Sequence, residues 1–235
     1  MSFLTAEWRK LAFANYEIEP DVLKPYLPKG TELDIWNGRC YASLVGFMFQ
    51  KVRVLGLKIP FHTAFEEVNL RFYVRYFAEG KWKRGVVFIH EFVPRFAISF
   101  MANTLYHERY KTMPMRHRWE TGQDSQAVSY EWKTGGRWHS FQLKAGLEPL
   151  PILPGSEAEF ITEHYWGYSK QAKNKTVEYQ VTHPKWAAYE VKSHEIRADF
   201  AQLYGENFRA LNQIQPLSVM LAEGSAITIE GKNEI

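Results

Sequence analysis

The most regular hydrophobic pattern in the chain is an alternation of apolar and polar residues between Glu67 and Tyr76. The apolar positions of this segment are Val68, Leu70, Phe72, Val74 and Tyr76. The positions between them are Glu67, Asn69, Arg71, Tyr73 and Arg75. Successive side chains of a β-strand point to opposite faces of its sheet. The alternation therefore predicts a strand with one apolar face and one polar face.

Further segments rich in β-branched and aromatic residues indicate strands along most of the chain. They cover residues 33–36, 40–54, 86–92, 127–133, 137–143, 177–182, 187–196 and 218–229. Asn37-Gly38 and Gly135-Gly136 stand between such segments, as is typical of tight hairpin turns. About ten strands with few helices predict a mainly β fold, a closed or nearly closed barrel or sandwich.

Three short helices are also expected. One begins near Pro20, because proline is favoured in the first turn of a helix, and ends before Pro28. A second follows Pro94 over residues 96–105, where the apolar residues have helical spacing, and we expect it to pack against the 67–76 strand. A third covers residues 156–162, with a capping serine at its start and a glutamate three residues on.

The organisation of the chain favours a single domain over residues 1–235, because no proline-rich or glycine-serine linker and no internal repeat divides it. Its one cysteine, Cys40, cannot form an intrachain disulfide. The first residues lack the apolar run of a signal peptide, and we expect a cytoplasmic protein. Charged residues or prolines interrupt every apolar segment, so no membrane span is expected.

Charge argues against one class of partner. The chain has 29 basic and 26 acidic residues, a formal net charge of +3. This near balance does not suggest a protein that binds nucleic acid. A small-molecule ligand is the expected partner, and assembly into a homo-oligomer stays open.

The common sequence motifs of catalytic sites are absent: the sequence has no P-loop, no dinucleotide-binding glycine pattern and no nucleophile elbow. His90-Glu91, His107-Glu108 and His194-Glu195 each place an imidazole beside a carboxylate. None has a second histidine four residues on, and neighbouring strand side chains face opposite ways. We therefore expect neither a metal site nor a cofactor.

The polar face of the 67–76 strand has two interpretations. It is a solvated outer surface, which the sequence by itself favours, or it points into a barrel. In the second case Glu67, Asn69 and Arg71 converge in a confined cavity, where buried charges are costly unless they are paired or bind a ligand.

Five segments, taken in order, resemble the YqjF-like family of uncharacterised proteins, in the acetoacetate decarboxylase-like superfamily. The segments are Phe65 to Arg75, Gly85 to Phe88, Leu105-Tyr106 with Tyr110, Phe160 to Tyr165, and His183 to Trp186. The resemblance extends from about residue 7 to residue 197. It implies an acetoacetate decarboxylase-like β-barrel with a central ligand cavity, and it favours an inward polar face on the 67–76 strand.

The decarboxylase relatives implied by this resemblance use a lysine that forms a Schiff base with a keto acid, beside a second lysine that lowers its pKa; acetoacetate decarboxylase is itself the standard example of this activation. In this chain Tyr110 stands at the position of the reactive lysine and Lys111 at that of its partner. A shift of one residue makes Lys111 the nucleophile, but without an adjacent lysine. An ordinary lysine amine is almost fully protonated at neutral pH and cannot attack a carbonyl.

The resulting hypothesis is a barrel that binds a small organic acid or carbonyl compound in an internal pocket. The expected ligand-binding residues are Glu67, Asn69, Arg71, Tyr73, Tyr110 and Glu163. Arg71 is the first choice for a carboxylate, because its planar guanidinium suits bidentate contact. The candidate catalytic groups are Glu67, Tyr110 and Lys111. Two alternatives stay open: a decarboxylase or aldolase that uses Lys111, and a structural or partner-binding protein without catalysis.

One prediction concerns Lys111. A Schiff-base enzyme needs a neutral amine, and Glu108 nearby in the sequence favours the protonated form. We expect that incubation with acetoacetate and borohydride leaves Lys111 unmodified in peptide mass spectra. Carbon dioxide release should equal that of a Lys111→Ala variant. A reduced adduct on Lys111 at neutral pH would restore the decarboxylase interpretation.

Overall fold

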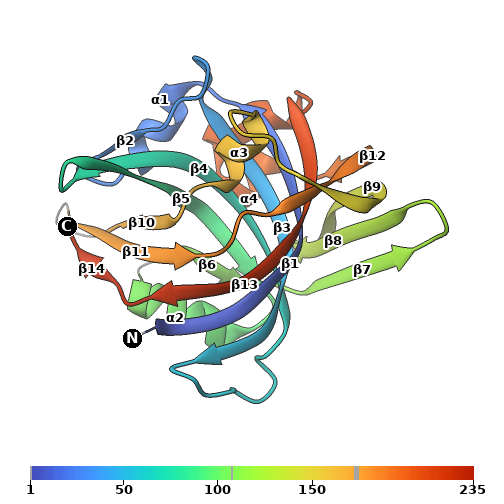
Figure 1. Cartoon of the computed structure of the whole chain (residues 1–235), viewed down its shortest axis with the longest axis horizontal. Coiled ribbons are helices and arrows are strands. Elements are labelled where there is room, and N and C mark those ends of the chain that lie inside the picture. Colours follow the sequence, from blue (N-terminus) through green and yellow to red (C-terminus); the bar gives the residue numbers. More distant parts are fainter. Residues whose placement is uncertain (1, 107, 172–174) are drawn as a thin grey trace.

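Seven strands pair side by side around a closed ring in the computed structural model, which describes residues 2–106, 108–171 and 175–235 (Figure 1). In ring order they are β13 (Ser218–Glu230), β1 (Ser2–Glu17), β3 (Tyr41–Val54), β4 (Phe65–Ala78), β5 (Lys81–Val93), β10 (Trp166–Lys170) and β11 (Thr176–Thr182). Pairing of Val181 with Ile229 joins β11 to β13 and closes the ring. The contact between β5 and β10 is parallel, and the other ring pairs are antiparallel.

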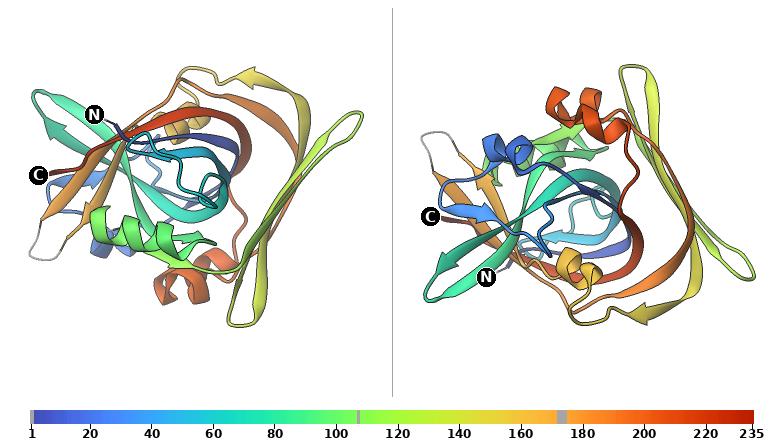
Figure 2. Two further views of the ribbon diagram at one scale, coloured as in Figure 1. Left: turned by 90° about the horizontal axis from the view of Figure 1, so that it is seen from below. Right: turned by 90° about the horizontal axis from the view of Figure 1, so that it is seen from above.

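Four more strands continue the sheet from β13 and form a second layer, here called the wing. They are β12 (Ala187–Arg197), β9 (Arg137–Pro151), β8 (Gln126–Thr134) and β7 (Met115–Thr121). Figure 2 shows the wing curving past one side of the ring. Three short strands pair with ring strands: β2 (Thr31–Leu33) with β4, β6 (Tyr110–Thr112) with β5, and β14 (Asn233–Glu234) with β11.

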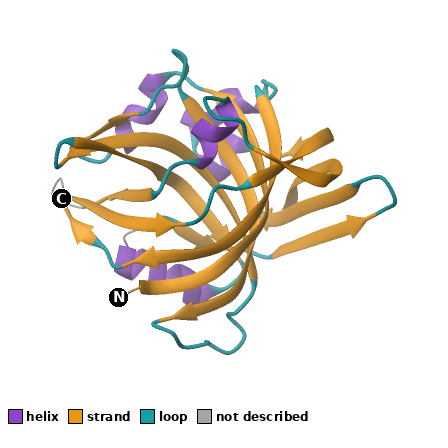
Figure 3. Cartoon of the chain, in the orientation of Figure 1, coloured by secondary structure: helices purple, strands orange, loops and turns teal. Residues whose placement is uncertain are grey.

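The described helices are short and lie around the sheet (Figure 3). They are α1 (Pro20–Leu23) with a 3-10 turn at Lys24–Tyr26, α2 (Phe96–Tyr106), α3 (Glu157–Thr162), and α4 (Phe200–Tyr204) with a 3-10 segment at Glu206–Asn212. The predicted serine cap of α3 is present, since Ser156 Oγ accepts a hydrogen bond from the Glu159 amide. None of the described helices is long and apolar enough to cross a membrane.

The position of α2 differs from the expectation. It packs mainly on β6 and β5, and its contact with β4 is weaker. The reason is local: β6 follows α2 closely and pairs with the edge of β5. The Asn103 side chain also holds the Tyr110 backbone through hydrogen bonds of 2.7 and 3.0 Å.

Both faces of β4 are buried. Val68, Leu70, Phe72 and Val74 point out of the ring and pack with wing and α4 residues such as Trp132, Phe141 and Leu203. The opposite face points into the ring, where Tyr73 packs with Phe13 and Val45. The wing therefore covers the outer face of β4, and neither face of residues 67–74 is exposed to solvent.

The ring and the wing approach closely at one glycine. A Cβ atom at Gly46 on β3 would lie 2.8 Å from Tyr130 of β8, so only glycine leaves room for that ring. The Tyr130 hydroxyl reaches past it and donates to the Lys10 carbonyl at 2.7 Å.

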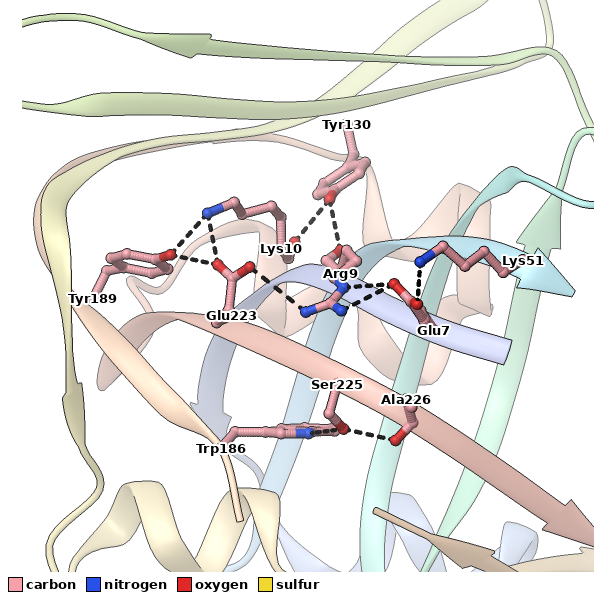
Figure 4. A network of polar contacts seen from close by, with 10 residues as sticks. All are labelled: Glu7, Arg9, Lys10, Lys51, Tyr130, Trp186, Tyr189, Glu223, Ser225 and Ala226. Atoms are coloured by element: carbon pink, nitrogen blue, oxygen red, sulfur yellow. Dashed lines mark hydrogen bonds and ion pairs between the residues drawn. The ribbon is translucent and has the colours of Figure 1, made fainter. Parts of the chain in front are cut away.

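A polar network holds the wing to the ring at an irregularity in β1 (Figure 4). Lys10 has a positive φ of 53°, and the β1–β3 register shifts between Arg9 and Ala12. This bulge turns the Lys10 ammonium toward Glu223 of β13, at 2.7 Å, and toward the Tyr189 hydroxyl of β12, at 2.9 Å. β1 itself was missed from the sequence, because the bulge interrupts its alternation.

The predicted fold class is confirmed: the chain is mostly strand with a few short helices. The strands expected at 40–54, 67–76, 86–92 and 137–143 all occur, most of them longer than predicted. The segment expected at 33–36 is instead the short β2 followed by a bridge between Trp36 and Arg39.

Candidate functional site

The ring encloses a cavity of about 60 Å³, between the inner faces of the ring strands. This is room for several water molecules. Its lining is mixed, with aromatic and aliphatic side chains around a polar set. The polar set comprises Glu67, Asn69, Arg71, Glu91, Tyr110, Thr162, His164, Tyr179 and His183.

The polar face of β4 points into this cavity. Glu67 and Asn69 are each 2% exposed and Arg71 is 9% exposed. The solvated interpretation of this face is therefore wrong. The physical reason is that the wing covers the other face of β4, so the strand's polar residues are enclosed by the ring and its apolar residues by the wing.

Three carboxyl groups meet at one side of the cavity. Glu67 accepts hydrogen bonds from the Asn69 amide and the Tyr110 hydroxyl, both at 2.9 Å. Glu108 accepts one from the Tyr179 hydroxyl at 2.8 Å. Glu91, on β5, is 1% exposed and completes the cluster. The described residues contain no group of acidic, histidine or cysteine side chains arranged to hold a metal ion.

Burial changes the protonation of all three carboxyls. Desolvation raises the pKa of Glu67 to about 7, against the opposing hydrogen bonds from Asn69 and Tyr110. Desolvation and the nearby Glu67 charge raise the pKa of Glu108 to about 8. The pKa of Glu91 is raised well above its ordinary value, first by desolvation and then by the charges of Glu108 and Glu67. At neutral pH the cluster therefore keeps protons that exposed glutamates lose.

Tyr179 reaches the carboxyl cluster because of the residue opposite it. Tyr179, on β11, pairs with Gly167 of β10, and a Cβ atom on Gly167 would collide with the phenol ring. Tyr110 enters from β6, where its neighbours along the strand face the other way.

Arg71 is the one arginine among the described residues that line the cavity. Its Nη2 donates to the Ile161 carbonyl at 3.0 Å, and its guanidinium lies 5.1 Å from the centre of the Phe13 ring. Its Nε has no hydrogen-bond partner among the described residues, and no described carboxylate lies within 4.0 Å. A buried N–H that lacks a partner is unusual and costly, so this guanidinium is incompletely satisfied by the described residues.

A histidine that the sequence reasoning did not select also lines the cavity. His164 Nε2 lies 3.2 Å from Asp34 Oδ2, which also accepts from Arg84 Nε at 2.6 Å. Burial lowers the pKa of His164 to about 4, so the ring is neutral. With its proton on Nε2 facing Asp34, Nδ1 is an acceptor, and this atom has no partner among the described residues.

Three of the expected site residues lie elsewhere. Tyr73 sits behind the cavity lining, where its hydroxyl shares a 2.7 Å hydrogen bond with Ser43 and its ring packs on His164. Glu163 ends α3 and accepts from the Tyr165 hydroxyl, outside the lining. Lys111 is exposed, because it follows the inward Tyr110 on β6 and so faces outward.

The structure brings together Glu67, Asn69, Arg71 and Tyr110, as expected. It adds Glu91, Glu108 and His164. Glu91 and Glu108 belong to two of the His-Glu pairs that the sequence analysis considered only as metal ligands. Both glutamates enter the carboxyl cluster, while His90 does not line the cavity. His107 lies outside the described residues.

The fold is that of acetoacetate decarboxylase-like proteins. The chain is similar over its full length to the enduracididine biosynthesis enzyme MppR, with a TM-score of 0.72, 13% identity and 88% of that chain covered in a structure with bound HEPES buffer. A structure of MppR complexed with pyruvate gives a TM-score of 0.70, 12% identity and 91% coverage of that chain. Acetoacetate decarboxylase from Legionella pneumophila gives 0.65 and 16% identity, over 98% of this chain and 86% of the other.

At these identities the structural similarity establishes the fold alone. The family is established by sequence: residues 5–226 match the DUF2071 family model, described as an uncharacterized conserved protein, and the chain belongs to this family. The uncharacterized protein YqjF of Bacillus subtilis is 27% identical over 184 residues, which cover 76% of this chain and 72% of YqjF.

The buried carboxyl cluster predicts how stability depends on pH. The pKa of Glu108 in the folded protein is raised above its ordinary value. Its contribution to the free energy of unfolding is therefore complete below about pH 4.5 and is lost as the pH rises toward 8. Glu108→Gln keeps an acceptor for Tyr179 but carries no charge. We expect this variant to melt at a higher temperature than the wild type at pH 8.5, by about 2 to 4 °C for each kcal/mol gained, and at nearly the same temperature at pH 5.

The matched control is Glu190→Gln, at an exposed position of β12, which should change neither melting temperature. Calorimetric melts at the two pH values make the comparison. Equal destabilisation of Glu108→Gln at both would contradict a protonated, buried Glu108.

Proposed function

We propose that the chain binds a short 2-oxo acid in the ring cavity, with the ligand's carboxylate on Arg71. The observation that carries this proposal is the buried Arg71 guanidinium: the side chain lines the ring cavity, and its Nε has no hydrogen-bond partner among the described residues. An arginine in this state is stabilised by an oxyanion, because charge-assisted hydrogen bonds are about twice as strong as neutral ones.

The surrounding groups suit the rest of such a ligand. Glu91 lines the ring cavity and keeps its proton at neutral pH, so it offers a hydrogen-bond donor in place of a repelling charge. The neighbouring Glu108 also stays protonated and adds no negative charge there. A ketone oxygen accepts a hydrogen bond but cannot donate one. The solved structure of MppR with pyruvate, which has the same fold, supports a 2-oxo acid as the ligand class.

The cavity offers no lysine for Schiff-base chemistry, since none occurs among the described residues that line it. Lys111 is exposed on the outward side of β6. Partial desolvation lowers the pKa of Lys111, but Lys111 does not line the ring cavity, so it would not contact a ligand held on Arg71. The decarboxylase or aldolase mechanism through Lys111 therefore has no support from the geometry.

A second candidate function is proton transfer at the carbon next to the ligand's carbonyl group. Two observations favour it. The pKa of Glu67 is about 7, the range in which a carboxyl exchanges protons most effectively at neutral pH. His164 is held by Asp34 with its Nδ1 acceptor unoccupied in the same cavity lining. In this role Glu67 or His164 removes the proton, and a neutral carboxyl of the cluster donates to the enolate oxygen.

The experiment is calorimetric titration of the protein with pyruvate. We expect Arg71→Gln to weaken pyruvate binding by at least about tenfold, because the charge-assisted hydrogen bonds are lost. Arg75→Gln is the matched control: it lies on the same face of the same strand, but its guanidinium pairs with exposed Glu32 outside the cavity. This control should bind pyruvate as the wild type does.

Melting temperatures of both variants show whether they are folded. Wild-type protein that takes up no pyruvate, or a folded Arg71→Gln variant that binds it unchanged, would refute the proposed function.

A further inference from the structure

A second pocket, of about 90 Å³, adjoins the ring cavity at the end of the ring covered by α2; it is called the outer pocket here. Four residues line both spaces: Phe49, Tyr110, Tyr179 and Ile229. The remaining lining of the outer pocket consists of Phe3, Leu4, Val52, Val54, Phe65, Ile98, Met101, Ala102 and Glu108. Apart from Glu108, this remainder is entirely apolar.

Polarity changes along a single strand face between the two spaces. Phe65, Glu67, Asn69 and Arg71 succeed one another on the inner face of β4. Phe65 lines the outer pocket, while the three polar residues line the ring cavity. Alternate residues of a strand are about 6.5 Å apart, so the two neighbouring spaces follow one another along this face, from apolar at Phe65 to polar at Arg71.

The boundary between the two spaces is built from groups that already have hydrogen-bond partners. Tyr110 donates to Glu67, and Tyr179 donates to Glu108. Both hydroxyl groups at the boundary are therefore satisfied within the protein, and neither requires a polar atom of a ligand beside it.

The roof of the outer pocket is α2, and it is fixed at two points. Ser99 Oγ and Thr112 Oγ1 lie 2.5 Å apart, and Asn103 holds the Tyr110 backbone. Ile98, Met101 and Ala102 face the pocket, whereas Phe96 and Phe100 are exposed on other sides of the helix. Figure 1 shows α2 at the same end of the ring as the N-terminus of β1, whose Phe3 and Leu4 also line the pocket.

We propose that the outer pocket holds the apolar tail of the ligand whose carboxylate binds Arg71, so that the preferred ligand is a 2-oxo acid with an aliphatic or aromatic side chain. This inference rests on the proposed function and adds its substrate class. Short acids such as pyruvate fill the ring cavity alone. Longer ones also remove apolar surface from water in the outer pocket.

The test is a series of straight-chain 2-oxo acids, from pyruvate to 2-oxooctanoate, titrated into the wild-type protein by calorimetry. Each methylene that enters the outer pocket should tighten binding about fourfold, until the pocket is full. Ala102→Phe, which fills the pocket from α2, should remove this gain and leave the affinity for pyruvate within about twofold of the wild type. Ala97→Phe is the matched control, because Ala97 is exposed on the same helix, and it should keep the gain.

The outcomes separate the two proposals. If no member of the series binds, the proposed function fails, and this inference with it. If pyruvate binds but longer acids gain nothing, or if Ala102→Phe keeps the full gain while binding pyruvate normally, the outer pocket is not the tail site and the proposed function stands. Ala102→Leu, a smaller change, gives an intermediate loss of the gain and serves if the phenylalanine variant does not fold.

Discussion

The closed ring places a polar strand face where water cannot solvate it, and the rest of the site depends on this constraint. Because the wing covers the outer face of β4, the side chains of Glu67, Asn69 and Arg71 must find partners inside the ring. The Asn69 amide donates a hydrogen bond to Glu67. Arg71 donates to the Ile161 carbonyl, and its Nε has no partner among the described residues. The buried carboxyls retain protons, which is the least costly state for acids removed from water.

The proposed function places an anion beside three carboxyl groups, of which Glu67 and Glu91 line the ring cavity and Glu108 lines the outer pocket. A carboxylate ligand would be repelled by three charged glutamates. Desolvation raises the pKa of all three, so the positive charge of Arg71 governs the local field at and below neutral pH. As the pH rises above about 7, Glu67 ionises and opposes the ligand. Anion affinity in such a site decreases toward alkaline pH.

The sequence predicts the local elements well and their burial poorly. The alternation at 67–76 identifies β4, but it is the same whether its polar face meets solvent or a cavity; the family resemblance, not the pattern, favours the inward choice. The Asp34–His164 pair joins residues that are 130 positions apart. No local spacing reports such a pair. Glu91 and Glu108 were visible in the sequence, but their meeting depends on the parallel pairing of β6 with β5.

The site expectations that differ also have local causes. Tyr73 shares the inner face of β4, yet α3 and the residues after it occupy the space beside it, so its ring packs on His164 and Phe160. Glu163 and His164 are neighbours in the same motif, and the turn that ends α3 sends the histidine inward. Lys111 faces outward because Tyr110 faces inward, where the Tyr110 hydroxyl donates a hydrogen bond to Glu67.

Proton uptake on ligand binding tests this account most directly. Pyruvate titrations at pH 7.5 in two buffers of different ionisation enthalpy count the protons that accompany binding. We expect net uptake of a fraction of one proton per pyruvate, because a carboxylate beside Arg71 raises the pKa of Glu67 further. Most of this uptake should disappear in Glu67→Gln. Binding with no dependence on the buffer, or with proton release, would contradict it.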